Sequence, residues 1–316
     1  MAKERIGIDV GGTNVKIALV DNKGKIIYSN SIPTRAEMGY EYTINNMKEA
    51  ITELIKETKS DPKNIESIGF GFPGQIDYQK GIVRLAPNIP GWVNVPIAEI
   101  MEKEFGIPTR VDNDVRCAAL GELNYGAGQG CDNLICITVG TGIGSGLVIN
   151  GKLVRGASNA AGEIGHIKLD MNGGPLCGCG DRGCLEAFAS GPSIVALAEE
   201  YIKGGKSTKY RELANPDITP YIVSEAAKQG DPVAKRIFTI VGEYIGIGLA
   251  SVVNLLNPEK IIIGGGVAAA GDLLLTPIKE SLIKRAMPIA GSAVEIVPAQ
   301  LGNSAGVIGA SLLINS

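Results

Sequence analysis

The only histidine of the chain and three of its six cysteines lie close together in the sequence, at His166, Cys177, Cys179 and Cys184. Three thiolates and one imidazole satisfy a tetrahedral Zn²⁺ ion and leave no position open for water. A zinc ion held in this way has a structural role and does not react. We therefore predict a closed metal site that shapes the surrounding loop.

Two carboxylates flank these metal ligands, Glu163 before His166 and Glu186 after Cys184. A loop closed around a metal would hold both acids rigidly, so that they could accept hydrogen bonds from neighbouring hydroxyl groups. His166 could donate a hydrogen bond from the ring nitrogen that does not bind the metal. This group suits a sugar, whereas either glutamate alone is more typical of a partner of a metal ligand or of a solvated surface acid.

Three glycine turns each follow an apolar strand pattern, at residues 9–13, 140–144 and 264–266. Without a Cβ atom the backbone can approach a phosphate and direct several N–H groups at it. None of the turns matches the Walker A pattern or the dinucleotide fingerprint, and any one of them could be a simple hairpin turn. Their number, together with Thr13 and Thr141, favours a site for the phosphates of a nucleotide.

Asp9 opens the first of these turns. The carboxylate could merely cap the turn, but at a strand end beside a phosphate loop it also suits Mg²⁺. This ion keeps most of its water shell and takes few protein carboxylates. We therefore predict that Asp9 contacts Mg²⁺ through water.

The sequence Val111-Asp-Asn-Asp114 marks a junction between a strand and a helix. Asn113 and Asp114 would make a good helix N-cap, and this structural role is one interpretation. The chemical interpretation makes Asp114 the general base that takes a proton from an attacking hydroxyl group, with Asn113 binding a neighbouring hydroxyl. His166 is a poor candidate for this base, because a metal would occupy one of its nitrogens.

Alternating strands and helices must position these residues. Period-two patterns and turn signals predict strands over residues 5–10, 15–20, 25–30, 67–72, 108–111, 134–139, 146–149, 260–263 and 294–297. Helical spacing and capping signals predict helices over residues 40–58, 113–125, 231–256 and 304–313. They also predict a short helix that ends at residue 105, further helices within 190–230, and a helix that begins near residue 271. Residues 73–96 are predicted to form a loop. The hairpin at residues 6–25 resembles the one that starts at 134, which indicates an internal duplication.

Size and charge exclude several classes of protein. The chain has 316 residues, enough for two domains, and 30 basic against 33 acidic residues give a net charge of −3. Nucleic acid is therefore not expected as a partner. No run approaches about 18 apolar residues, and no signal peptide is evident, so we expect no membrane span and a cytoplasmic protein.

Seven segments together resemble the ROK family of sugar kinases and repressors, and within it most resemble the bacterial ATP-dependent glucokinases. These segments cover the chain almost from end to end: 9–13, 69–74, 88–92, 111–114, 140–144, 162–166 and 177–186. The resemblance implies an actin-like, hexokinase-like α/β fold with two ribonuclease-H-like domains and an interdomain cleft. We place the smaller domain at residues 1–120 with 300–316, and the larger one, with the zinc loop, at 121–299.

The resemblance also implies roles for individual residues. Asp114 matches the catalytic base. Positions that match sugar contacts are Gly74, Asn113, Asp114, Glu163, His166 and Glu186. Positions that match the phosphate loops are Asp9, Gly11, Gly12, Thr13, Thr141 and Gly142, and Gly265 and Gly266 match the adenosine motif. Zinc ligands are matched by His166, Cys177, Cys179 and Cys184. One departure is Asp112, where many relatives carry Glu.

The implied activity is ATP-dependent phosphorylation of glucose at its 6-hydroxyl, with ATP, Mg²⁺ and a structural Zn²⁺ ion. A homo-oligomer, either a dimer or a tetramer, is expected. Fructose, mannose or N-acetylmannosamine is the alternative substrate, since no single residue selects glucose. Repressors of the family carry a helix-turn-helix domain ahead of the first phosphate loop, and the short stretch before Asp9 argues against that class. An actin-like ATPase would have no use for the sugar-binding residues.

Overall fold

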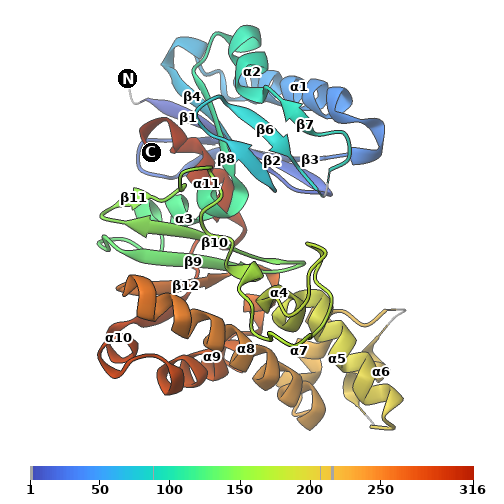
Figure 1. Ribbon diagram of the computed structural model, residues 1–316. Coiled ribbons are helices and arrows are strands. Elements are labelled where there is room, and N and C mark those ends of the chain that lie inside the picture. The colour runs from blue at the N-terminus through green and yellow to red at the C-terminus, as the bar shows by residue number, and fades with distance from the viewer. Residues whose placement is uncertain (1–2, 88, 207, 215–216) are drawn as a thin grey trace. The chain divides into compact units, whose positions relative to one another are not determined.

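A computed structural model describes residues 3–87, 89–206, 208–214 and 217–316 (Figure 1). Asn88, the first residue of one of the family motifs, lies outside these ranges. The chain forms two compact units. Unit 1 comprises Met1–Asp132, Gly146–Gly162 and Gln300–Ser316, and unit 2 comprises Asn133–Ser145 and Glu163–Ala299. The domain bounds expected from the sequence stay a prediction.

Unit 1 contains a five-stranded sheet of order β3-β2-β1-β4-β8. The strands are β1 (Glu4–Val10), β2 (Asn14–Val20), β3 (Ile26–Pro33), β4 (Ile65–Phe72) and β8 (Thr109–Asn113). Strand β2 runs antiparallel to its neighbours β1 and β3, whereas β4 and β8 run parallel to β1. The candidate site residues Asp9 and Asn113 therefore lie at the carboxyl ends of parallel strands, with Asp114 directly after β8, at the same edge of this sheet.

A second five-stranded sheet has the order β11-β10-β9-β12-β13. Its strands are β9 (Leu134–Val139), β10 (Ile143–Ile149), β11 (Lys152–Leu153), β12 (Lys260–Gly264) and β13 (Glu295–Pro298). The boundary between the units falls within β10, after Ser145. As in the first sheet, the first three strands along the chain are neighbours connected by short turns, and the last two run parallel to the first of them. The predicted duplication is therefore confirmed at the level of topology.

The segment predicted as a loop between residues 73 and 96 instead forms a small antiparallel sheet, so this prediction was wrong. Its strands are β5 (Gln75–Asp77), β6 (Ile82–Leu85) and β7 (Val93–Val95). They are only three or four residues long, and proline and glycine separate them. Such strands are too short to give a clear period-two pattern.

The helices of unit 1 are α1 (Tyr40–Thr58), α2 (Ile97–Phe105), α3 (Asp114–Tyr125) and α11 (Ala305–Ser311). Helix α11, red in Figure 1, packs against α3 and against the blue strand β1. Gly7 and Gly69 pair across β1 and β4, and a Cβ atom on either would collide with a backbone carbonyl of α11. Glycine at both positions therefore lets the helix lie directly on the sheet.

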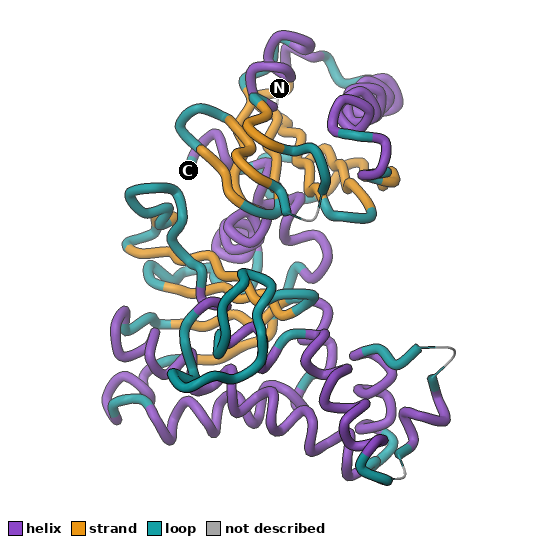
Figure 2. Tube along the Cα trace, turned by 45° about the vertical axis from the view of Figure 1, so that its right-hand side comes forward, coloured by secondary structure: helices purple, strands orange, loops and turns teal. Residues whose placement is uncertain are grey.

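The helices of unit 2 gather beside its strands (Figure 2). They are α4 (Leu185–Ala189), α5 (Gly191–Lys203), α6 (Lys209–Leu213), α7 (Pro220–Lys228), α8 (Pro232–Leu256), α9 (Asp272–Arg285) and α10 (Pro288–Ala293). Asp231 caps α8 by accepting hydrogen bonds from Val233 and Ala234, as predicted. Helix α10 was missed, because it is only six residues long.

Among the described residues, α8 is the one helix long and apolar enough to cross a membrane by length and composition. Half of its apolar stretch is buried inside the protein, where α8 packs against α9, α7 and α4. A wide apolar surface is typical of a helix buried between layers. We therefore interpret α8 as the core helix of unit 2.

Candidate active site

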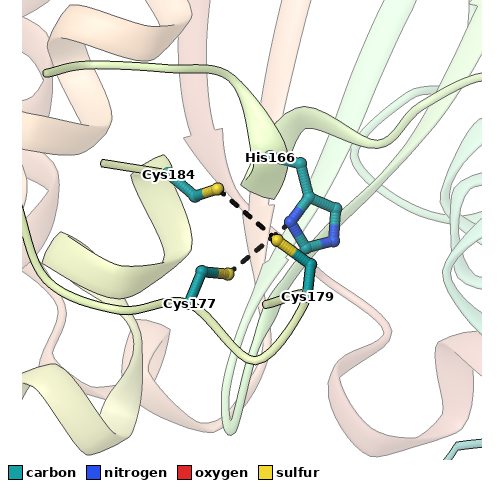
Figure 3. A group of neighbouring side chains, drawn as sticks. All are labelled: His166, Cys177, Cys179 and Cys184. Carbon is teal, nitrogen blue, oxygen red and sulfur yellow. Dashed lines mark hydrogen bonds between the residues drawn. The ribbon is translucent and has the colours of Figure 1, made fainter. Parts of the chain in front are cut away.

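The four predicted zinc ligands come together in unit 2 (Figure 3). Their ligand atoms all lie within 4.8 Å of one another, with 3.7 Å between Sγ of Cys179 and Sγ of Cys184. The Nδ1 atom of His166 is also 3.7 Å from Sγ of Cys177. Zn–S bonds of about 2.3 Å in a tetrahedron require sulfur atoms about 3.7 Å apart. The donor set and its spacing therefore fit one tetrahedral Zn²⁺ ion.

Hydrogen bonds within the loop hold these ligands in place. The backbone N–H of Cys177 donates to the carbonyl of Asp181 at 2.8 Å, and Lys168 and Cys184 form a bridge between antiparallel segments. The Nζ atom of Lys168 lies 3.1 Å from Sγ of Cys184 and 2.6 Å from the carboxylate of Asp181. The loop is thus closed by backbone contacts as well as by the four ligands.

The three thiols differ in their electrostatic surroundings. Burial raises the pKa of Cys177 to about 12. For the exposed Cys179, a hydrogen bond with the backbone of Asp181 lowers the pKa. The hydrogen bond to Asp181 raises the pKa of Lys168, which stays cationic beside Cys184. A bound cation is therefore what would make all three sulfurs thiolates at neutral pH.

Glu186, on the first turn of α4, connects this cluster to the second glycine turn. Its Oε2 atom accepts the backbone N–H of Ile143 at 2.8 Å, and its Oε1 atom lies 3.6 Å from Sγ of Cys177. A Cβ atom on Gly142 would collide with this carboxylate. A predicted sugar contact, Glu186, is therefore hydrogen-bonded within unit 2 to the residue that follows a predicted phosphate contact, Gly142.

Glu163 and His166 lie at the two ends of a single 3-10 turn, Ile164–His166, that follows Glu163. The Glu163 side chain is exposed, and the backbone N–H of His166 donates to the Glu163 carbonyl at 3.1 Å. Gly165 between them packs against the Ile143 carbonyl, where a Cβ atom would not fit. The turn is thus fixed to the start of β10, beside the Glu186 carboxylate.

The two glycine turns of unit 2 lie at the ends of β9 and β12. The N–H of Gly140 donates to the carbonyl of Gly142 at 2.9 Å, and this tight turn leaves Thr141 exposed. Gly265 has φ of 87°, and a Cβ atom there would collide with the backbone of Val139. The positive φ angle and the lack of space for a Cβ atom therefore both require glycine at position 265. Gly266 is exposed beside it.

In unit 1 the first glycine turn is held by hydrogen bonds from Thr34, which directly follows β3. The Oγ1 atom of Thr34 donates to the Gly11 carbonyl at 2.7 Å, and its N–H donates to the Thr13 carbonyl at 2.9 Å. Gly12 and Thr13 are exposed at the tip. The turn is therefore a fixed structure with its tip open to solvent.

Asp9 is partly buried at the end of β1. Burial raises the pKa of its carboxyl group, and the charge of Lys16, its partner in the ladder, opposes this rise. Gly306 of α11 leaves space for the carboxylate, since a Cβ atom there would lie 2.8 Å from it. A partly buried carboxylate at the end of a strand, beside a glycine turn, fits the predicted role beside Mg²⁺.

Asn113 is the N-cap of α3. Its Oδ1 atom accepts from the N–H groups of Val115 and Arg116 at 3.0 and 3.3 Å, and its Nδ2 atom donates to the Gly74 carbonyl at 3.3 Å. Asp114 is the first residue of the helix, and its Oδ1 atom also accepts from Val115, at 2.9 Å. Asn113 therefore caps the helix, which is the structural role considered for it from the sequence. Its hydrogen bond to Gly74 also holds the Gly74 loop close to Asp114, the proposed base.

Sequence reasoning missed Asp112, which has no exposed surface and contacts two arginines, Arg116 and Arg155. The signal available was an acid at the end of a buried strand with an arginine four residues later. Arg155 could not be found in this way, because it is distant in the sequence.

Comparison with known proteins places these residues in context. A model of the ROK family matches residues 5–316. The chain is 40% identical to the glucokinase of Halalkalibacterium halodurans over 314 residues, which cover 98% of this chain and 94% of that protein. It is also 34% identical to the xylose repressor of Caldicellulosiruptor bescii over 312 residues, or 98% of this chain and 78% of that protein.

The structure is similar to that of a ROK family glucokinase from Streptomyces griseus in complex with glucose and AMPPNP. The TM-score is 0.83 and the identity 35%, with 98% of each chain covered. The α/β, hexokinase-like fold expected from the sequence is thereby confirmed. The family model and these relatives span almost the whole chain, and the protein therefore belongs to the ROK family.

Proposed function

We propose that this protein is an ATP-dependent glucokinase, which transfers the γ-phosphoryl group of ATP to the 6-hydroxyl of glucose. Relatives named as glucokinases cover nearly the whole chain, and one of them was solved with glucose and AMPPNP. The products are glucose 6-phosphate and ADP.

The hydrogen bond between Glu186 and the N–H of Ile143 carries this proposal on structural grounds. It joins a carboxylate suited to sugar hydroxyls to a glycine turn suited to phosphates. A phosphoryl transferase needs its acceptor and donor held in a fixed relation, because positioning supplies much of its acceleration. A plain phosphate-binding ATPase would have no need for such a carboxylate.

Each candidate residue would have a separate role in the reaction. Asp114, on the first turn of α3, takes the proton from the 6-hydroxyl of glucose. Asn113, Glu163, Glu186 and His166 bind the other sugar hydroxyls, with Gly74 in the adjoining loop. The phosphates lie on the first two glycine turns, and the adenosine lies at Gly265–Gly266.

Zinc and magnesium complete the proposal. His166, Cys177, Cys179 and Cys184 would hold Zn²⁺ as a structural ion, and Asp9 would hold Mg²⁺ through water. Mg²⁺ supplies charge neutralisation at the phosphates. With Cys177 as a thiolate ligand, no S–H group remains to donate to Glu186, and the Oε1 atom of Glu186 can accept from a sugar hydroxyl instead.

A coupled assay of ADP release with Mg·ATP tests this function. We expect a rate that depends on glucose and exceeds the rates with fructose, mannose and N-acetylmannosamine. A higher kcat/KM with one of those sugars would reassign the substrate and keep the kinase. ADP release that is independent of any sugar would refute the proposal, and sugar-dependent binding to DNA without turnover would favour the repressor class.

We further propose a cytoplasmic homo-oligomer, a dimer or a tetramer. None of the six cysteines, all of which lie within the described residues, forms a disulfide, which suits a reducing compartment. Leu255, Met287 and Ile289 expose 82%, 66% and 86% of their surface on unit 2, and exposed apolar groups of this kind favour self-association. Light scattering coupled to size-exclusion chromatography would give the mass, and a monomer would contradict this part.

A further inference from the structure

A buried charge network lies directly beside the proposed catalytic pair in unit 1. The carboxylate of Asp112 accepts from Nη1 of Arg116 at 3.1 Å and from Nε of Arg155 at 2.7 Å. The Asp112 and Arg116 side chains are 0% and 4% exposed, and that of Arg155 is 14% exposed. Two guanidinium groups therefore share one carboxylate away from water.

Asp112 also fixes the backbone at the start of α3. Its Oδ1 atom accepts the N–H of Asn113 at 2.8 Å. Asn113 in turn caps the helix and donates to the carbonyl of Gly74. The orientation of the proposed base, Asp114, is thus set by a residue two positions earlier that does not itself reach the surface.

The arginines extend this anchoring to a segment distant in the sequence. The Nη2 atom of Arg116 donates to the carbonyls of Asn159 and Ala161 at 2.8 and 2.9 Å. Arg155 lies over the ring of Tyr78, with its Cζ atom 3.6 Å from the centroid. The segment 155–161, which leads to Glu163, is therefore fixed to the first turn of α3.

Each member of the network makes contacts that the other two do not supply. The carboxylate of Asp112 is shared by both arginines, so its removal would leave two guanidinium groups without that carboxylate, which costs far more than the pairs contribute. Arginine suits the site because its planar fork can bond to a carboxylate and to carbonyls at the same time. A lysine could supply the charge of Arg116 but not its three hydrogen bonds.

We infer that Asp112, Arg116 and Arg155 are positioning residues for phosphoryl transfer: together they hold the Asn113–Asp114 pair and the segment 155–161 in the geometry that the reaction requires. The inference rests on the proposed kinase function. It assigns no contact with substrate to any of the three residues.

Arg155→Met and Arg116→Met test this role against a matched control, Arg5→Met. Arg5 also belongs to unit 1, its side chain is also 14% exposed, and its Nε atom lies 2.8 Å from a carboxylate of Glu66. We expect kcat to fall on the order of 10- to 100-fold in the two test variants, with the KM for ATP within about twofold of wild type. Arg5→Met should keep the kcat of wild type. Equal kcat values in all three variants would overturn the inference.

Hydrogen exchange supplies a readout that does not depend on turnover. Amides of residues 113–116 and 155–161 should exchange faster in Arg116→Met than in wild type, and should not change in Arg5→Met. Unchanged exchange at both segments would overturn the positioning role. Arg116→Lys should recover part of the kcat lost in Arg116→Met, because it restores the charge only.

Paired replacement covers the case in which a single variant does not fold. Asp112→Asn combined with Arg116→Gln removes the two most buried charges of the network, one of each sign, and leaves only Arg155, the most exposed of the three side chains. A folded double variant with wild-type kcat would also refute the inference. If wild-type protein itself shows no sugar-dependent ADP release, the proposed function fails instead, while the exchange data still report on the network.

Discussion

The carboxylate of Glu186 accepts the backbone N–H of Ile143 at 2.8 Å, within the glycine turn 140–144 that is proposed to bind phosphate. Glu186 lies two residues after Cys184, which is one of the four proposed zinc ligands. The proposed metal loop, sugar-binding acid and phosphate turn of unit 2 are therefore connected through one short helix. A change in any one of them is expected to reach the other two.

Cys184→Ser is the direct test of this connection. The sequence alone suggests that metal loss would weaken the binding of glucose and spare that of ATP, but the bond from Glu186 to Ile143 leads us to expect that both KM values rise. We expect the KM for glucose to rise about tenfold or more and the KM for ATP to rise less. Changes of this size are typical when the residues around a metal site are altered.

Steady-state kinetics and zinc content by atomic absorption check this prediction together. Cys131→Ser is the matched control, since Cys131 is a free cysteine outside the cluster. An unchanged KM for ATP in a zinc-free Cys184→Ser protein would show that the phosphate turn does not depend on the metal loop.

Asp114→Ala should abolish most turnover without unfolding the protein. We expect kcat to fall by about 10² to 10⁴, the usual contribution of a general base, while the KM for glucose changes much less. The helix should persist because its N-cap is Asn113 and not Asp114. Single-turnover kinetics and a thermal melt check both parts, and near-normal turnover would remove Asp114 from the mechanism.

Asp9→Asn should stabilise the ligand-free, magnesium-free protein at neutral pH while reducing turnover steeply. Burial raises the pKa of Asp9 in the folded state. Its stabilising contribution is therefore fully present below the unfolded value of about 3.9 and is lost as the pH rises through the folded pKa. The asparagine variant avoids this loss.

Thermal melts across pH check the sign of this effect. The melting temperature of Asp9→Asn should exceed that of wild type at pH 7, and the two should converge as the pH falls toward about 4. A wild-type protein that is the more stable one at pH 7 would mean that Asp9 already has a compensating partner in the folded state.

Two glycines of α11 should respond to alanine in opposite ways. At Gly306 a Cβ atom would lie 2.8 Å from the Asp9 carboxylate, a side-chain end that can move, so we expect lower kcat with little loss of stability. At Gly309 it would collide with the backbone carbonyl of Cys117 in α3, which cannot move without separating the helices. Gly309→Ala should therefore destabilise unit 1 by several kcal/mol, at roughly the upper end of single-residue effects.

Urea unfolding and activity measured on the same two variants separate these outcomes. The assignment of Gly306 would be wrong if its alanine variant kept full turnover. A stable Gly309→Ala protein would mean that α3 and α11 can move apart at little cost.

Local patterns sufficed for much of the fold. Apolar strands beside glycine turns and the Asp231 cap of α8 are encoded within a few residues, and the repeated hairpin predicted the repeated sheet. The strands between residues 75 and 95 were missed because each is too short to show a period. Clustering of His166 with three cysteines was visible from residue types alone. In contrast, neither the bond from Glu186 to Ile143 nor that from Arg155 to Asp112 could be predicted, since folding alone brings those residues together.

The placement of α11 has a consequence for how the protein is made. The sheet of unit 1 is covered by a helix that the ribosome synthesises only after all of unit 2, because Gly7 and Gly69 lie against the backbone of residues 307–310. A nascent chain that has reached residue 299 thus carries the whole sequence of unit 2 but still lacks the helix that covers the sheet of unit 1. The faces of β1 and β4 that α11 buries stay uncovered until the final residues of the chain are available.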